Sequence, residues 1–142
     1  MLIQYFKNAN KNKNSYPEEL KSILNIEDCK SAYNEIKTWD NYLPTPLLSL
    51  KNIANEIGVK NIYYKNESYR FGLGSFKALG GTYGVLKFIY NRLKQEIGKK
   101  VTINKIKDGS YIDFISKYTV TTATDGNHGR AVAFGAKFFG CK

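Results

Sequence analysis

The chain has 142 residues, of which 42% are hydrophobic, and its 22 Lys and Arg against 12 Asp and Glu give a formal net charge of +10. This length suits one compact domain with an adequate core, and the hydrophobic share excludes a wholly disordered chain. No apolar run approaches the roughly 18 residues of a membrane helix, and the N-terminus lacks the apolar stretch of a secretory signal, so we expect a cytoplasmic protein with no membrane partner.

The first 40 residues form an N-terminal arm rich in Asn and Lys. Pro17 followed by two acidic residues is typical of a helix start, because proline fits the first turn and carboxylates favour the positive end of the helix dipole. We predict a short helix over residues 17–24 and another over 27–38.

The ordered part of the chain begins at Leu43-Pro44-Thr45-Pro46-Leu47, where the two prolines impose an extended backbone. The apolar spacing over residues 50–57 predicts a helix, and Gly58 stands where a left-handed C-cap falls. The β-branched and aromatic residues of 61–65 predict a first strand.

A loop over residues 66–75 is expected to lead into a long helix over 76–97. Ser75 is its predicted N-cap and Gly98 its end. The predicted apolar stripe is Leu79, Tyr83, Leu86, Tyr90, Leu93 and Ile97. The helix also holds three glycines, each of which costs about 1 kcal/mol against Ala, so we expect it to pack very closely on a neighbour.

Residues 99–117 are polar, with a weak helical pattern near 110–117, and β-branched residues at 118–124 predict a second strand. A glycine-bearing turn then leads into a helix ending at Phe139, with Gly140 as its terminator. Two successive strand-loop-helix units predict an α/β fold with a parallel sheet covered by helices.

Ligands of open α/β sheets bind where loops lead from strands into helix N-termini. One such loop precedes Lys77, whose amine the positive helix end would favour in the uncharged form that imine chemistry needs, although a merely solvated lysine also fits. The other loop holds Asn127, an amide donor. There His128 is either an acid/base group or structural, and Asp125 is either functional or a helix N-cap.

The charge and the cysteines point to no further ligand. The basic residues are 19 Lys and three Arg spread along the chain, whereas nucleic-acid readers gather them on a recognisable motif. Cys29 and Cys141 lie far apart and His128 is the single histidine, so we expect neither a disulfide nor a metal. We therefore expect no nucleic-acid partner, and a basic nucleic-acid module stays an alternative.

Four motifs together resemble the fold type II pyridoxal-phosphate enzymes, the tryptophan synthase β and threonine dehydratase group. They are Asn66-Glu67-Ser68, Ser75-Phe76-Lys77, Gly80-Gly81 and Gly126-Asn127-His128-Gly129. The resemblance covers about residues 40–142 and implies pyridoxal 5'-phosphate as cofactor. It implies that Lys77 forms the internal aldimine and that Phe76 packs near the cofactor ring. Asn127 would bind the ring hydroxyl oxygen within a loop that includes Gly126 and His128.

Within that group, residues 67–81 and 121–133 are similar to diaminopropionate ammonia-lyase, as is the extra stretch 99–117. The resemblance implies a lyase of amino-acid catabolism that eliminates ammonia from 2,3-diaminopropionate and yields pyruvate. Lys77 would be the base on one face of the substrate, and Asp125, where most dehydratases have Ser or Ala, would serve the other, so that D and L isomers both react. A threonine or serine dehydratase-like ammonia-lyase is the alternative.

The same resemblance implies parts that are not found in these 142 residues, above all the later glycine-rich loop that binds the cofactor phosphate. We therefore expect an N-terminal portion of the three-layer fold: an arm over 1–40, the first part of the large lobe over 41–98, and an insertion with the start of the small lobe over 99–142. The full-length family is expected to form homodimers. We expect the chain alone to be inactive, and a non-catalytic fragment that needs a complementary chain is an alternative.

Overall fold

The computed structural model of the chain describes residues 6–11, 14–98, 100–124 and 126–142. Its contacts divide the chain into two compact units, Met1–Asn34 and Glu35–Lys142. The predicted boundaries at residues 40 and 98 separate lobes of the complete fold rather than units of this chain, and they stay a prediction.

The first unit is helical. It holds the 3-10 helix η1 (Glu18–Ser22) and most of helix α1 (Ile26–Ile36), close to the two predicted helices. Asn25 starts α1, because its side-chain oxygen accepts the backbone N–H of Asp28 at 2.7 Å. Large apolar side chains such as Ile23 and Ile26 are exposed in this unit.

The second unit begins with a two-stranded ribbon. Strand β1 (Leu47–Ser49) pairs antiparallel with β2 (Tyr63–Lys65), so that Leu47 lies opposite Lys65, and helix α2 (Lys51–Ile57) connects them. Gly58 ends α2 in the predicted left-handed conformation. The first predicted strand therefore exists, but its partner is antiparallel.

The prediction of a second strand at residues 118–124 is wrong: this segment is extended chain without ladder pairing. Within the described ranges the only ladder joins β1 to β2. A strand is defined by a neighbour that takes its N–H and C=O groups, and β propensity at 118–124 cannot supply one. The parallel sheet expected from the order of elements is consequently not seen in the described part of the chain.

The described residues of the second unit hold five further helices. They are the 3-10 helix η2 (Glu67–Gly72), α3 (Lys77–Ile97), α4 (Ile103–Lys107), α5 (Ile112–Ile115) and α6 (Asn127–Phe139). The bounds of α3 and α6 agree with the predicted helices. Helix α4 was not predicted; the Thr102 hydroxyl caps it by accepting the N–H of Lys105 at 3.4 Å.

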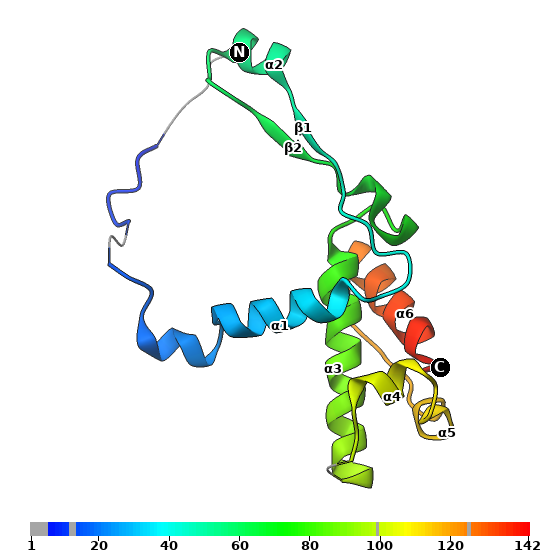
Figure 1. Cartoon of the computed structure of the whole chain (residues 1–142). Coiled ribbons are helices and arrows are strands. Elements are labelled where there is room, and N and C mark those ends of the chain that lie inside the picture. Colours follow the sequence, from blue (N-terminus) through cyan, green and yellow to red (C-terminus); the bar gives the residue numbers. More distant parts are fainter. Residues whose placement is uncertain (1–5, 12–13, 99, 125) are drawn as a thin grey trace. The chain divides into compact units, whose positions relative to one another are not determined.

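Helices α3 and α6 pack against each other side by side and run in the same direction (Figure 1). A Cβ atom placed on Gly81 would lie 2.7 Å from the Cβ of Ala131, and one on Gly135 would lie 2.9 Å from the Cα of Thr82. The glycines therefore permit a backbone approach that any side chain would prevent. The expected close packing of the glycine-bearing helix is confirmed.

This contact decides which face of α3 is buried. The buried residues are Ala78, Gly81, Thr82, Val85, Leu86, Ile89 and Leu93. Leu86 and Leu93 lie on the predicted stripe, but its last member, Ile97, is 40% exposed. The buried face is rotated toward small residues, because these meet α6. A core of Trp39, Val101, Ile106, Ile115 and Phe139 continues from it.

An ion pair within η2, between Arg70 and Glu67, is hydrogen-bonded to the segment before β1. The guanidinium of Arg70 is 5% exposed and donates to both carboxylate oxygens of Glu67, at 2.8 and 3.0 Å. Arg70 also donates to the Leu43 carbonyl at 2.9 Å, and the Thr45 hydroxyl donates to Glu67. The hydrogen bonds from Arg70 lower the pKa of Glu67 below its ordinary value of 4.5.

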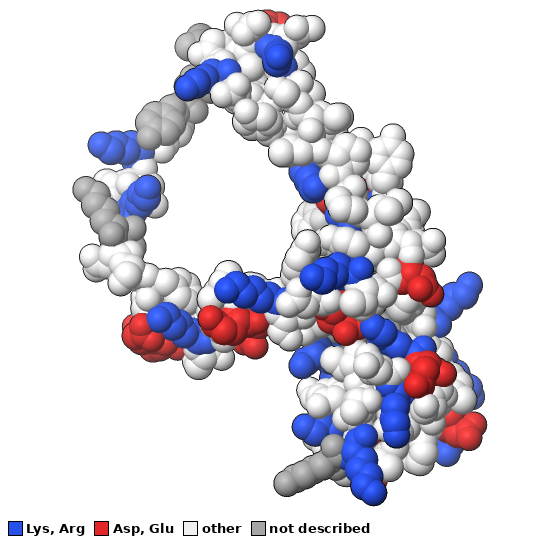
Figure 2. Space-filling model, in the orientation of Figure 1, with Lys and Arg blue, Asp and Glu red and all other residues white. Residues whose placement is uncertain are grey.

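Among the described residues, no helix has the length and apolar character to cross a membrane. Lys and Arg side chains are scattered over the visible face with acidic side chains among them (Figure 2).

Alanine at Gly81 and at Gly84 should have opposite effects on stability. Both positions lie inside α3, where alanine gains about 1 kcal/mol of helix propensity. Gly84 has open space around it, so Gly84→Ala should stabilise by up to about that amount. Gly81→Ala should destabilise by about 1–3 kcal/mol, because α6 must move away. Urea unfolding of both variants measures this, and equal effects at the two positions would contradict the helix contact.

Stability should fall in acid partly through Glu67. Its folded-state pKa lies below the unfolded value, so its contribution is fully present above about pH 4.5 and is lost as pH falls through the folded pKa. Glu67→Gln should lower the free energy of unfolding near neutral pH, and the two proteins should converge in acid. Urea unfolding at several pH values tests this; a difference that does not change with pH would contradict it.

Candidate active site

Lys77 is the first residue of α3, and its side chain is exposed to solvent. The hydroxyl of the buried Ser75 accepts the backbone N–H of Lys77 at 3.2 Å. The N-cap position of α3 is Phe76, one residue after the predicted Ser75. Phe76 is 63% exposed. A primary amine and an aromatic ring are thus presented together at the positive end of a 21-residue helix.

The first residues of α6 carry the second group of predicted site residues. Gly126 precedes the helix with φ of 153°, and Asn127 and His128 are the first helical residues, all three exposed. Asp125 lies outside the described residues, so its predicted roles stay predictions.

The cap of α6 was missed by the sequence reasoning. The hydroxyl oxygen of Thr124 accepts the backbone N–H of Gly126 at 3.2 Å and that of Gly129 at 2.9 Å. Threonine is a favoured capping residue, which is the signal that could have identified it. Because Gly129 has no Cβ, the Thr124 side chain can lie directly against its backbone.

The packing of the two helices brings both groups to one end of the pair. Gly81, four residues after Lys77, contacts Ala131, four residues after Asn127. The Thr82 hydroxyl also donates to the Ala131 carbonyl at 3.3 Å. Since α3 and α6 run in the same direction, Lys77 and Asn127 begin neighbouring helices at the same end (Figure 1).

This arrangement has a definite chemistry. An exposed amine can add to a carbonyl carbon, an amide side chain can hydrogen-bond an oxygen, and two helix N-termini favour a negatively charged group. Among the described residues, no group of three or more His, Cys, Asp or Glu is placed to hold a metal ion.

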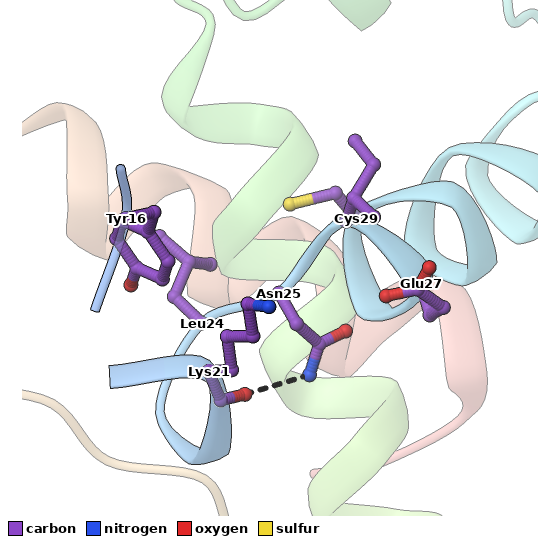
Figure 3. Close-up of a pocket in the computed structure, with 7 residues that line it drawn as sticks. Tyr16, Lys21, Leu24, Asn25, Glu27 and Cys29 are labelled. Carbon is purple, nitrogen blue, oxygen red and sulfur yellow. Dashed lines mark hydrogen bonds between the residues drawn. The ribbon is translucent and has the colours of Figure 1, made fainter. Parts of the chain in front are cut away.

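A separate pocket lies within the first unit (Figure 3). It measures about 480 Å³, and its lining residues are Tyr16, Lys21, Leu24, Asn25, Ile26, Glu27 and Cys29. The Asn25 amide donates to the Lys21 carbonyl at its edge, at 3.0 Å. None of the predicted site residues lines this pocket.

Comparison of the chain with known proteins identifies its relatives. The profile of the family described as "Pyridoxal-phosphate dependent enzyme" matches residues 38–142. The diaminopropionate ammonia-lyase of Salmonella typhimurium is 36% identical over 141 residues, which are 99% of this chain and 34% of that protein. That of Escherichia coli K12 is 41% identical over 99 residues, 70% of this chain and 24% of that protein.

Solved structures agree. The selenomethionine-containing holo form of Escherichia coli diaminopropionate ammonia-lyase matches with a TM-score of 0.61 and 33% identity, over 82% of this chain and 28% of that one. The apo form matches with a TM-score of 0.59, over 81% of this chain and 30% of that one. The chain spans about a third of the length of the Salmonella relative. It belongs to the family of pyridoxal-phosphate dependent enzymes.

Proposed function

We propose that the chain is the lysine-bearing part of a diaminopropionate ammonia-lyase, in which the Lys77 amine holds pyridoxal 5'-phosphate covalently. The observation that carries this proposal is the parallel packing of α3 and α6, which puts an exposed amine and an exposed amide at one end of a helix pair. The names of the two lyase relatives support the substrate, 2,3-diaminopropionate.

The residues present fit this cofactor. Pyridoxal phosphate is an anionic aromatic aldehyde, and Lys77 offers the amine, Phe76 an exposed ring and Asn127 an amide donor. The two helix N-termini supply a positive potential for its negative groups. We assign Gly126 and His128 to the same cofactor-binding loop. When bound, the cofactor supplies an electron sink that makes the α-proton of an amino acid removable.

The proposed proton transfers use two residues of this chain. The Lys77 amine takes the α-proton from one face of the substrate, and the Asp125 carboxylate serves the opposite face. Overall, 2,3-diaminopropionate and one water yield pyruvate and two molecules of ammonia. A serine or threonine dehydratase-like reaction is the runner-up, and a substrate panel containing all three amino acids distinguishes them.

The activity is proposed for a protein of the relatives' length, because this chain spans about a third of it. For that protein we propose the parallel three-layer sheet and the homodimer of the family. The ribbon β1-β2 then gains strand neighbours from the rest of the fold.

Pyridoxal phosphate should label Lys77 in preference to the other lysines. The chain is incubated with a small excess of the cofactor, reduced with borohydride and mapped by mass spectrometry. We expect weak binding, but most of the label on Lys77 and its loss in Lys77→Ala, with Lys87→Ala on the same helix as the matched control. Equal labelling of all exposed lysines would contradict the proposed role.

Lyase activity should require the remainder of the fold. Alone, the chain should release no ammonia from 2,3-diaminopropionate. Co-expressed with the C-terminal two-thirds of the Salmonella relative, it should form pyruvate, which a coupled dehydrogenase assay measures. Stoichiometric cofactor binding together with turnover by the chain alone would refute this expectation.

Asp125→Asn in that complemented enzyme should reduce turnover of the D isomer far more than that of the L isomer, because the carboxylate is proposed to act on one face only. Measurement of kcat for each isomer decides this. Equal losses would exclude the assigned role.

A further inference from the structure

The ion pair of Arg70 and Glu67 is the centre of a hydrogen-bond network that reaches the segment before β1. Arg70 is 5% exposed, yet it makes four hydrogen bonds, two of them to Glu67. The other two reach the Leu43 carbonyl at 2.9 Å and the Thr45 hydroxyl at 3.1 Å. A planar guanidinium can satisfy these four acceptors at once, whereas the ammonium of lysine cannot. Arg70 is therefore held in one position and orientation.

The next residue, Phe71, is held from a different direction. Its backbone has a positive φ of 48°, which residues other than glycine rarely adopt. Its ring stacks on that of Phe134, with centroids 5.7 Å apart and planes 27° from parallel. The centroid of the Trp39 ring lies 6.2 Å from that of Phe71. Phe134 belongs to α6, the helix that begins at Asn127. Such a backbone conformation persists where the surroundings determine it strongly.

Five residues, 72–76, connect these two anchors to Lys77; we call them the lysine loop. The loop starts from a turn in which the Leu73 N–H bonds the Arg70 carbonyl at 2.9 Å. Near its end, the Ser75 hydroxyl accepts the backbone N–H of Lys77 at 3.2 Å. Because it is short and fixed at both ends, its path depends on where Arg70 and Phe71 are held.

We propose that Arg70 and Phe71 are positioning residues that set the lysine loop against α6 and thereby fix Lys77 relative to Asn127. Arg70 ties the loop to the Leu43–Thr45 segment, and Phe71 ties it to α6 through Phe134. This inference rests on the role proposed for Lys77. It adds that the geometry between the amine and the amide depends on two residues outside the cofactor-binding set proposed above.

Amide hydrogen exchange of the 142-residue chain without cofactor tests the positioning directly. Arg70→Met alone would leave the half-buried Glu67 carboxylate without its ion-pair partner, so the main variant is Arg70→Met/Glu67→Gln, which removes both charges. We expect peptides covering 72–79 to exchange about tenfold faster or more, with the centre of α3 unchanged. Arg70→Lys should show the same local effect, because it lacks the planar fork.

The control is Arg92→Met, on α3. Arg92 pairs with Glu96 at 3.4 Å, but the two side chains are 50% and 36% exposed and lie far along α3 from Lys77, so peptides covering 72–79 should not change. Phe71→Gly tests the second anchor, because glycine removes the backbone strain together with the ring. Faster exchange in 72–79 supports the aromatic anchor; retained or slower exchange overturns it.

Cofactor labelling supplies the second readout. In the Arg70→Met/Glu67→Gln protein, the preferential borohydride-fixed labelling of Lys77 by pyridoxal phosphate should fall at least about fivefold relative to its level in Arg92→Met. The midpoint of the unfolding transition of the helical chain should be the same in both proteins. If exchange in 72–79 is unchanged, or rises equally throughout α3 and α6, the positioning role is wrong. If the unmodified chain shows no preference for Lys77, the role proposed for Lys77 fails, whereas the exchange result still decides the positioning role.

Discussion

Helices α3 and α6 approach each other closely because a glycine on one faces an alanine on the other: a Cβ at Gly81 would lie 2.7 Å from that of Ala131. Interiors pack at crystal-like density, so a single added methyl group must displace a helix. This contact explains why α3 holds Gly81, although a glycine weakens it as a helix. The same contact fixes the position of Lys77 relative to Asn127, because it lies about one turn from the start of both helices.

Two other kinds of contact carry this arrangement to the loop before α3. Polar contacts centre on Arg70, whose burial is compensated by hydrogen bonds to Glu67 and to the Leu43–Thr45 segment. Removal of one partner would leave an uncompensated charge, which is more damaging than removal of both. Aromatic contacts centre on Phe71, which joins the loop to Phe134 on α6. The motif residues around Lys77 are thus structural supports as well as chemical groups.

Predictions from the sequence succeeded where the cause is local. The bounds of α2, α3 and α6 followed from apolar spacing, capping residues and terminal glycines, which act within a few positions along the chain. They failed at residues 118–124, because a strand depends on a neighbour that can lie anywhere in the sequence. The cap of α6 was not predicted, because Asp125 is also a favoured capping residue and lies next to Thr124. The Thr124 hydroxyl accepts two backbone N–H groups.

The sequence by itself determined helices α2, α3 and α6 and the four motifs, and through these motifs the family, because residue types at short spacing suffice for both. Only the tertiary structure decided that Lys77 and Asn127, 50 residues apart, begin neighbouring helices at the same end. The tertiary structure alone determined which face of α3 is buried and which aromatic rings pack against Phe71. These features depend on how closely two backbones can approach, which is a property of the packed chain and not of any one segment.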